Sequence, residues 1–389
     1  MMFTPTRAAG LDRLTAFLPR AGRNYAALRN LDLPGHPHVS TLSPWLRHRL
    51  VTEAEVIDAT LRAHPRGAEK FLAEVWWRTY WKGWLELRPG IWSAYRQGLT
   101  AALHRLAVEP GLAARAEAAM MGTTGIDGFD HWAQELVATG YLHNHARMWF
   151  ASIWIFTLHL PWELGADFFL RHLIDGDPAS NTLSWRWVGG LHTPGKTYLA
   201  TEDNIARNTE GRFRPGGLAL DAPPLPMHPQ PAPRPAPQGD RFDPTLASML
   251  LVSDDDLSPD FLLDQGLRPR VIAALTNVAG RSPRAVAGPV QRFTTGAIAD
   301  TLARLQAPDT PIFGSADLSG LLDLADGEGV RQIVTPYAPT GPVANTLDEL
   351  LRLAEPRGIT LARVLRDHDR FAWPHATHGF FRFREAVMG

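Results

Sequence analysis

A proline-rich segment divides this chain. Nine of the residues 222–244 are proline, and proline removes a backbone N–H donor and blocks a helix or a paired strand from running through. A segment of this kind is extended and semi-rigid. Because 389 residues exceed one ordinary domain, the sequence predicts two folded parts, 1–221 and 245–389, joined by a linker at 222–244.

The part before the linker has helical periodicity and many tryptophans. Within residues 71–87, Trp77, Trp81 and Trp84 recur at the spacing of one helix face. Residues 128–140 and 143–174 continue the helical spacing, with a break at Pro161. Of the 13 tryptophans in the chain, only Trp373 follows the linker. The sequence therefore predicts an all-helical first domain with an aromatic interior.

The part after the linker has a different rhythm. Short apolar runs, such as MLLV at 249–252 and VIAAL at 271–275, are bounded by turn residues and alternate with helical patterns such as 296–307. This alternation is typical of a parallel sheet with helices on its faces. We therefore predict a smaller α/β domain at 245–389. It contains neither a GxGxxG nor a Walker A motif, so no nucleotide role can be inferred for it.

Composition excludes several kinds of site. The chain has no cysteine, so disulfides, thiol catalysis and iron–sulfur or zinc–thiolate centres are excluded. The acids at 254–256 are better explained as a loop or helix start than as a metal site, and we expect no metal. No apolar run is long enough to span a bilayer, and the N-terminus lacks a signal-peptide pattern. We expect a cytoplasmic protein with no membrane contact.

The run DGDPASNTLSWRWVGG, residues 175–190, mixes acids, an amide and tryptophans. It has no clean helix or strand period, because Pro178 and small residues interrupt it. The nearby LHNHARM (142–148) adds Arg147. A flavin or electron-transfer site uses such groups: an arginine–carboxylate pair, an amide and oxidisable indoles. The alternative is structural, with Trp185 and Trp187 in the core.

In combination, these segments resemble the FAD-binding helical domain of the photolyase/cryptochrome family. ELVATGYLHNHARM and LIDGDPASNTLSWRWVGG carry the resemblance, and four other pieces occur in the family's order. These pieces are Tyr25, VSTLSPWL (39–46), AEVWWRTYW (73–81) and TTGIDGFD (123–130). The resemblance covers about residues 10–210 and implies an all-helical fold that binds FAD.

The resemblance assigns flavin contacts by position. The residues that match the family's FAD-binding positions are Tyr25, Ser40, Leu42, Ser43, Arg78, Asn144, Arg147, Asp175, Asp177 and Asn181. Tyr25 and the segment 40–43 would hold the phosphates and ribityl chain. Arg147 and Asp175 would form an ion pair over the isoalloxazine, and Asn181 would face its N5. One departure is His38-Val39, where the family has Gly-Thr.

The same resemblance implies an electron route and a lesion pocket. Trp185 and Trp162 match the proximal and middle tryptophans of photoreduction, while the distal position falls at Glu109 and could be supplied by Trp92 or Trp149. The positions that bind a cyclobutane dimer, and that would be catalytic, are occupied by Glu74, Trp77, Asn144, Met148 and Trp187. Tyr141 replaces one tryptophan of the family's pocket wall.

Domain order departs from the family, in which an antenna-binding α/β domain precedes the helical one. Here the α/β region follows the linker, so we expect a permuted order in which 245–389 is a relocated antenna-like domain. An unrelated fused domain is the alternative. Whether it holds a second chromophore cannot be inferred.

Two classes of function follow from the resemblance. The first is a light-driven deoxyribodipyrimidine photolyase, a monomeric enzyme acting on damaged DNA. The alternative is a cryptochrome-like blue-light photoreceptor or regulatory flavoprotein without repair activity. A light-independent flavoprotein is a third possibility. Charge does not decide between them, because the first 220 residues are only mildly basic.

Overall fold

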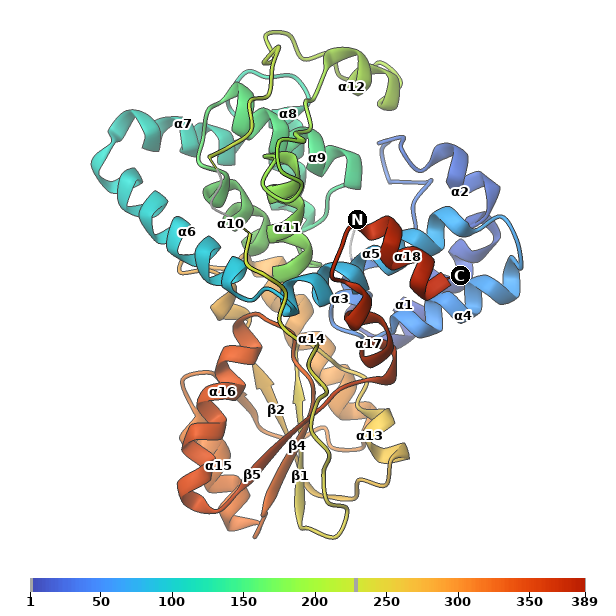
Figure 1. Ribbon diagram of the computed structural model, residues 1–389, viewed down its shortest axis with the longest axis vertical. Helices are drawn as coiled ribbons and strands as arrows, with labels where there is room; N and C mark the ends of the chain where they lie inside the picture. Colours follow the sequence, from blue (N-terminus) through green and yellow to red (C-terminus); the bar gives the residue numbers. More distant parts are fainter. Residues whose placement is uncertain (1–2, 227–229, 389) are drawn as a thin grey trace.

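The computed structural model describes residues 3–226 and 230–388, and residues 227–229 of the expected linker lie outside the described residues. A helical part lies above a five-stranded sheet in the view of Figure 1. The observed architecture confirms the predicted fold class, helical in the first part and parallel α/β in the second. Within the described residues, every helix is too short or too polar to span a lipid bilayer.

The helices before the linker are α1 (Arg7–Phe17), α2 (Arg23–Leu28), α3 (Ser43–Arg47), α4 (Glu53–Ala63), α5 (Glu69–Glu86), α6 (Gly90–Val108), α7 (Pro110–Met121), α8 (Phe129–Thr139), α9 (Asn144–Ser152), α10 (Trp162–His172), α11 (Pro178–Val188) and α12 (Glu202–Asn208). A π-helical turn, Ile153–Thr157, follows α9, and Pro161 precedes α10. The predicted break at Pro161 is therefore present, since a proline cannot donate to the preceding helical turn.

The elements after the linker are β1 (Ser248–Ser253), α13 (Asp260–Asp264), β2 (Pro269–Thr276), α14 (Gly288–Arg304), β3 (Ile312–Gly314), α15 (Leu318–Gly327), β4 (Gln332–Pro336), α16 (Pro342–Ala354), β5 (Thr360–Val364), α17 (Asp367–Ala372) and α18 (Phe380–Met388). The sheet has the order β3-β2-β1-β4-β5, with every pair parallel. Side chains of β1 alternate: Met249 and Leu251 pack with α15 and α16, while Leu250 and Val252 pack toward α14 and the N-terminal helices.

Helix α11 corrects one reading of the sequence. Residues 175–190 have no amphipathic period, yet residues 178–188 are helical. Asp177 caps this helix, because its Oδ1 accepts a hydrogen bond from the Ser180 amide at 2.8 Å, and Pro178 occupies the first helical position. The period is absent because most of the helix is buried on all sides, and such a helix needs no polar face.

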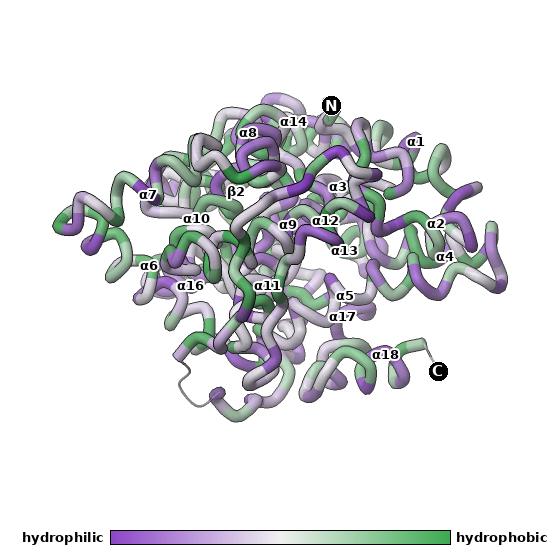
Figure 2. The backbone as a smooth tube through the Cα atoms, turned by 90° about the horizontal axis from the view of Figure 1, so that it is seen from above, coloured by the Kyte–Doolittle hydropathy of each residue, from purple (hydrophilic) through white to green (hydrophobic). Residues whose placement is uncertain are grey.

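The end of the chain returns to the helical part. Residues 245–389 are expected to form one α/β domain, but α17 and α18 pack on α5, and Ala372, Phe380 and Phe383 join the core of the helical part. Figures 1 and 2 both place α17 and α18 beside α5. The physical reason is aromatic burial, because Phe380 and Phe383 pack against the aromatic side chains of α5.

The linker lies against both parts. The Leu225 amide donates to the Gly189 carbonyl at 3.0 Å, and the Arg234 amide donates to the Leu87 carbonyl at 2.8 Å. Near the sheet, the Asp240 amide donates to the Arg363 carbonyl at 2.8 Å. The described residues of the linker are thus tied to the folded parts at intervals by backbone amides of residues other than proline.

Buried charges join the two parts. Arg49, only 2% exposed, contacts Glu53 at 3.2 Å, Asp256 at 3.2 Å and Asp369 at 2.7 Å. Arg47 contacts Asp255 at 2.7 Å. Two of the three acids that follow β1, Asp255 and Asp256, thus form ion pairs with arginines that precede α4. Removing one partner of such a cluster leaves a buried charge uncompensated, which costs several kcal/mol.

Lys82 is the exception in this cluster. Its side chain is 2% exposed and has neither a hydrogen bond nor an ion pair within the part of the chain that the structure describes. It faces a small cavity that Asp177, Asp255 and Thr340 also line. Burial, followed by the charges of Arg49 and Arg78, lowers the pKa of Lys82 to about 8, although Asp177 and Glu53 oppose the shift.

Replacing Lys82 by Met should change the pH dependence of stability. Below pH 8 Lys82 is charged in both the folded and the unfolded protein, so the free-energy cost of burying its charge is fully present. This cost falls to zero as the pH rises from about 8, the pKa in the folded protein, to 10.5, the pKa in the unfolded protein. We expect Lys82→Met to raise the free energy of unfolding by about 1–3 kcal/mol at pH 7, with the gap closing toward pH 10. Urea denaturation at pH 7, 8, 9 and 10 measures it. A gap independent of pH would contradict the expectation.

Replacing Gly83 by Ala should loosen the returning C-terminus. A Cβ on this residue of α5 would lie 2.6 Å from Cδ1 of Trp373, a fully buried side chain. Overpacking of this kind costs about 1–3 kcal/mol, so thermal unfolding should begin at a lower temperature. Gly111→Ala is the matched control, because the nearest atom to its Cβ would be Arg115 Nη1 at 3.8 Å. An equal effect of both variants would contradict the packing argument.

Candidate functional site

The first part of the candidate site is a stripe of accessible residues on α5. Between Phe71 and Glu86 this helix is buried except at Glu74, Trp77 and Arg78. These positions are three and four residues apart, so they share one face of the helix. The Glu74 side chain keeps 34% of its surface accessible.

A second stripe with the same spacing lies on α9. Asn144 is exposed, and Arg147 and Met148 are half-buried, while the neighbouring Ala146, Trp149 and Phe150 are buried. The spacing again puts the accessible residues on one helix face. The sequence-predicted residues of α5 and α9 thus retain solvent access beside buried neighbours, as His145 on α9 also does.

Ion pairs connect the two stripes. An Arg147 nitrogen donates to Asp175 at 2.8 Å, and Arg78 lies 3.5 Å from Asp177. Because Asp175 and Asp177 are two residues apart at the start of α11, these contacts join α9, α11 and α5. The predicted Arg147–Asp175 pair is present in the structure. Its role beside a flavin remains an inference from the resemblance.

Asp177 at this junction differs from Glu74 in its electrostatics. Burial alone would raise the pKa of Asp177, but the charges of Arg78, Lys82 and Arg47 outweigh it and hold the pKa below the ordinary range. Asp177 is therefore a fixed negative charge. Glu74 forms an ion pair with Arg29, yet burial raises the pKa of its carboxyl against the opposing effect of that arginine.

The segment 40–43 provides backbone groups at a helix start. Thr41 has a left-handed φ of 53°, and α3 begins two residues later at Ser43. The Ser40 hydroxyl accepts a hydrogen bond from the Leu42 amide at 3.3 Å. The first amides of a helix have no internal partner, and an anionic phosphate can satisfy them. Tyr25 lies nearby in the core, packed edge-on against Phe71.

The amide and the tryptophans of α11 are held tightly. The Asn181 Nδ2 donates to the Ala166 carbonyl at 2.8 Å, which fixes the orientation of the amide. Trp185 is buried against Gly165, where a Cβ would come within 2.3 Å of the indole ring. Trp187 is half-buried and stacks on Tyr198 with ring centroids 5.7 Å apart.

Aromatic side chains continue from Trp162. Its ring lies 5.7 Å from Tyr95, which lies 5.2 Å from Trp92. Glu109, the position of the expected distal tryptophan, is on the surface in an ion pair with Arg105. Trp149 instead packs against Trp132 at 5.3 Å. Of the two alternatives for the distal relay, Trp92 is the one that connects to Trp162, through the ring of Tyr95.

Sequence reasoning missed the partners of these residues. Arg29 forms an ion pair with Glu74, and Lys82 lines the same small cavity as Asp177. Neither residue belongs to a sequence motif. Phe380 also escaped notice, although its ring lies 3.8 Å from that of Trp77. Their proximity arises from contacts between distant segments, for which the sequence offers no local signal.

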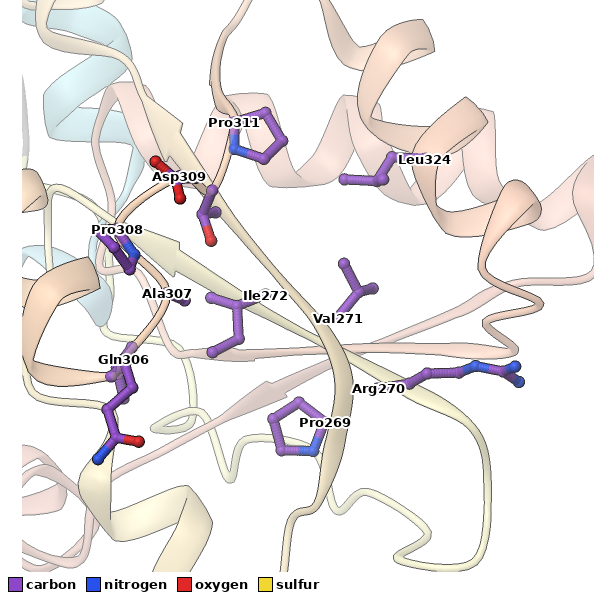
Figure 3. Close-up of a pocket in the computed structure, with 12 residues that line it drawn as sticks. Pro269, Arg270, Val271, Ile272, Gln306, Ala307, Pro308, Asp309, Pro311 and Leu324 are labelled. Carbon is purple, nitrogen blue, oxygen red and sulfur yellow. The ribbon is translucent and has the colours of Figure 1, made fainter.

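The open hollow in Figure 3 lies elsewhere, beside the first half of β2. Pro269, Ile272, Pro308, Pro311 and Leu324 are among the residues that line it. Its charged residues, Arg270 and Asp309, are exposed, so this hollow has no buried ionisable group and none of the predicted site residues.

Unpaired polar atoms test whether the site suits FAD. Asp175 Oδ1 and Thr41 Oγ1 are buried without a hydrogen-bond partner among the described residues, whereas Arg78 Nε lies 3.5 Å from Glu53 Oε1. The carboxylate oxygen offers an acceptor and the threonine a hydroxyl, and buried groups of this kind normally find partners. The polar edge of an isoalloxazine alternates donors and acceptors, and the pyrophosphate needs donors. The residues present therefore fit the cofactor.

Comparison with known proteins agrees with this chemistry. The family model for the FAD binding domain of DNA photolyase matches residues 71–210. The deoxyribodipyrimidine photo-lyase of Streptomyces griseus is 36% identical over 163 residues, which cover 42% of this chain and 34% of that protein. That of Thermus thermophilus is 32% identical over 222 residues, covering 54% and 49% respectively.

Among solved structures, a Synechocystis cryptochrome matches 52% of this chain and 43% of its own, with 21% identity and a TM-score of 0.42. The chain spans between a third and a half of the length of the two curated relatives described above. Residues 71–210, which the family model matches, contain the stripes of α5 and α9 and the start of α11. Residues 71–210 carry an FAD-binding domain of the DNA photolyase type.

Proposed function

We propose that this protein is a light-driven photolyase that splits cyclobutane pyrimidine dimers in DNA. The observation that carries the proposal is the pair of accessible stripes, Glu74 and Trp77 on α5 and Asn144 and Met148 on α9, at the positions where the family binds a dimer. Photo-lyase names among the relatives support the same reading. Arg78 and Arg147 complete the two stripes.

The chain's own residues would bind and orient the two reactants. Reduced FAD, when bound and excited by blue light, supplies one electron to the dimer and regains it after the ring has opened. Arg147 and Asp175 would hold the isoalloxazine, and the phosphates would lie against residues 40–43. Trp77 and Trp187 would enclose a dimer flipped out of the strand, as an unstacked base requires. Glu74 would leave Arg29 and hydrogen-bond the dimer's bases.

The α/β part belongs to the same proposal. We infer that residues 245–389 contain the relocated counterpart of the family's antenna domain, joined to the helical domain of 1–221 by the linker at 222–244. Its five parallel strands and the covering helices on both faces support this reading. The buried charges around Arg49 make it a fixed neighbour of the helical part rather than a tethered module.

The decisive test is repair itself. Purified protein with reduced FAD, illuminated with blue light, should restore dimer-containing oligothymidine, measured by loss of the dimer in chromatography. Restoration should be absent in the dark. If FAD is bound and neither single nor double strands are restored, the proposal fails, and the cryptochrome-like photoreceptor takes its place.

Replacing Glu74 by Ala should slow repair without loss of flavin. A hydrogen bond to a charged group contributes about 1.5–3 kcal/mol, so the rate should fall at least about tenfold, while Glu74→Gln should keep part of the activity. The visible flavin spectrum reports cofactor content. Glu117→Ala, on the exposed side of α7, is the control. Equal repair rates for Glu74→Ala and the control would show that Glu74 does not bind the dimer.

Photoreduction should depend on Trp185 and Trp92. Trp185→Phe should abolish flavin reduction under blue light with an external reductant, because phenylalanine is far harder to oxidise than tryptophan. Trp92→Phe should slow it, whereas Trp149→Phe should not, because Trp92 follows Tyr95 and Trp162. Absorbance of oxidised flavin during illumination measures all three variants. The reverse order for Trp92 and Trp149 would place the route on the other side of Trp185.

A further inference from the structure

The last helix of the chain touches the proposed dimer site. Phe380, the first residue of α18, is 4% exposed, and its ring stacks face to face on Trp77 with centroids 3.8 Å apart and planes 10° apart. Tyr80 and Trp81 contact the same indole at 5.4 Å and 5.0 Å, in edge-on and tilted geometry. Phe380 is therefore the side chain that fixes one face of the Trp77 ring.

Phe380 is itself held firmly. The Tyr80 hydroxyl donates to the His378 carbonyl at 2.9 Å, and Arg88 donates to the Thr377 carbonyl at 2.8 Å. Phe383, one turn along α18, is fully buried and lies 5.4 Å from Tyr80. The approach of α18 to α5 visible in Figures 1 and 2 is thus fixed by hydrogen bonds before the helix and by an aromatic anchor within it.

Trp77 needs such support because it is only half-buried. A partly exposed indole can occupy several rotamers, and ordering it on contact with a ligand costs conformational entropy. A stacked aromatic neighbour removes that cost in advance and adds the attraction of an offset or parallel ring pair. A residue that stacks on a substrate is most effective when its plane is already set.

We propose that Phe380 is a positioning residue for the repair site, which holds the Trp77 indole in the orientation that stacks on the dimer. The inference rests on the proposed repair function for the role of Trp77. It assigns to the C-terminal helix, about 300 positions away in the sequence, a part in a site that is otherwise built from residues 25–187.

The test compares Phe380→Ala with Phe381→Ala. Phe381 is the next residue of the same helix but is 70% exposed, so it controls for general effects on α18. Phe380→Ala should raise the KM for dimer-containing oligothymidine by about threefold to tenfold, with flavin content unchanged. Phe381→Ala should match the wild type. Phe380→Tyr keeps the stacking ring and should restore the wild-type KM, which a merely structural defect elsewhere would not predict.

A second readout does not require repair. In protein labelled with 5-fluorotryptophan, the Trp77 resonance, identified by its loss in Trp77→Phe, should broaden or split in Phe380→Ala and stay sharp in Phe381→Ala. If the wild type shows no repair but the resonance responds in this way, the proposed function fails while Phe380 still orders Trp77. An unchanged resonance, an unchanged KM, or faster repair by Phe380→Ala would overturn the inference; faster repair would mean that Phe380 covers the face that the dimer needs.

Discussion

The guanidinium of Arg49 joins three segments on which the arrangement of the whole chain depends. It contacts Glu53 at the start of α4, Asp256 after β1 and Asp369 in α17. Since the arginine and its three acids are buried, their desolvation is compensated only when all of them are in place. The cluster therefore fixes the sheet beneath the helices and brings the end of the chain back to α5.

Helix α5 transmits that arrangement to the site. One of its faces carries Lys82 and Glu86 into the interface with the sheet, and another carries the solvent-accessible residues Glu74, Trp77 and Arg78. Glu86 accepts hydrogen bonds from Tyr337 and from Arg234 of the linker. A change in domain packing would thus move the same helix that bears the proposed dimer contacts. The position of the dimer contacts therefore depends on the packing of α5 against the sheet.

Local patterns predicted most of this fold, and packing explains where they fell short. The period of Trp77, Trp81 and Trp84 located α5 at 71–87, against an observed 69–86. The helix α11 was missed because most of it is buried on all sides and has no polar face to generate a period. The C-terminal residues were assigned to the α/β domain because their helical pattern does not reveal which surface they cover.

The sequence by itself determined the fold classes and the FAD-binding domain at 71–210, because periodicity and ordered motifs are local properties of the chain. It also located Arg147 and Asp175, whose ion pair the structure contains. Only the tertiary structure decided which side chains meet: Arg29 pairs with Glu74, Lys82 shares a small cavity with Asp177, and Phe380 stacks on Trp77. Such pairs depend on long-range packing and desolvation, and neither leaves a spacing in the sequence.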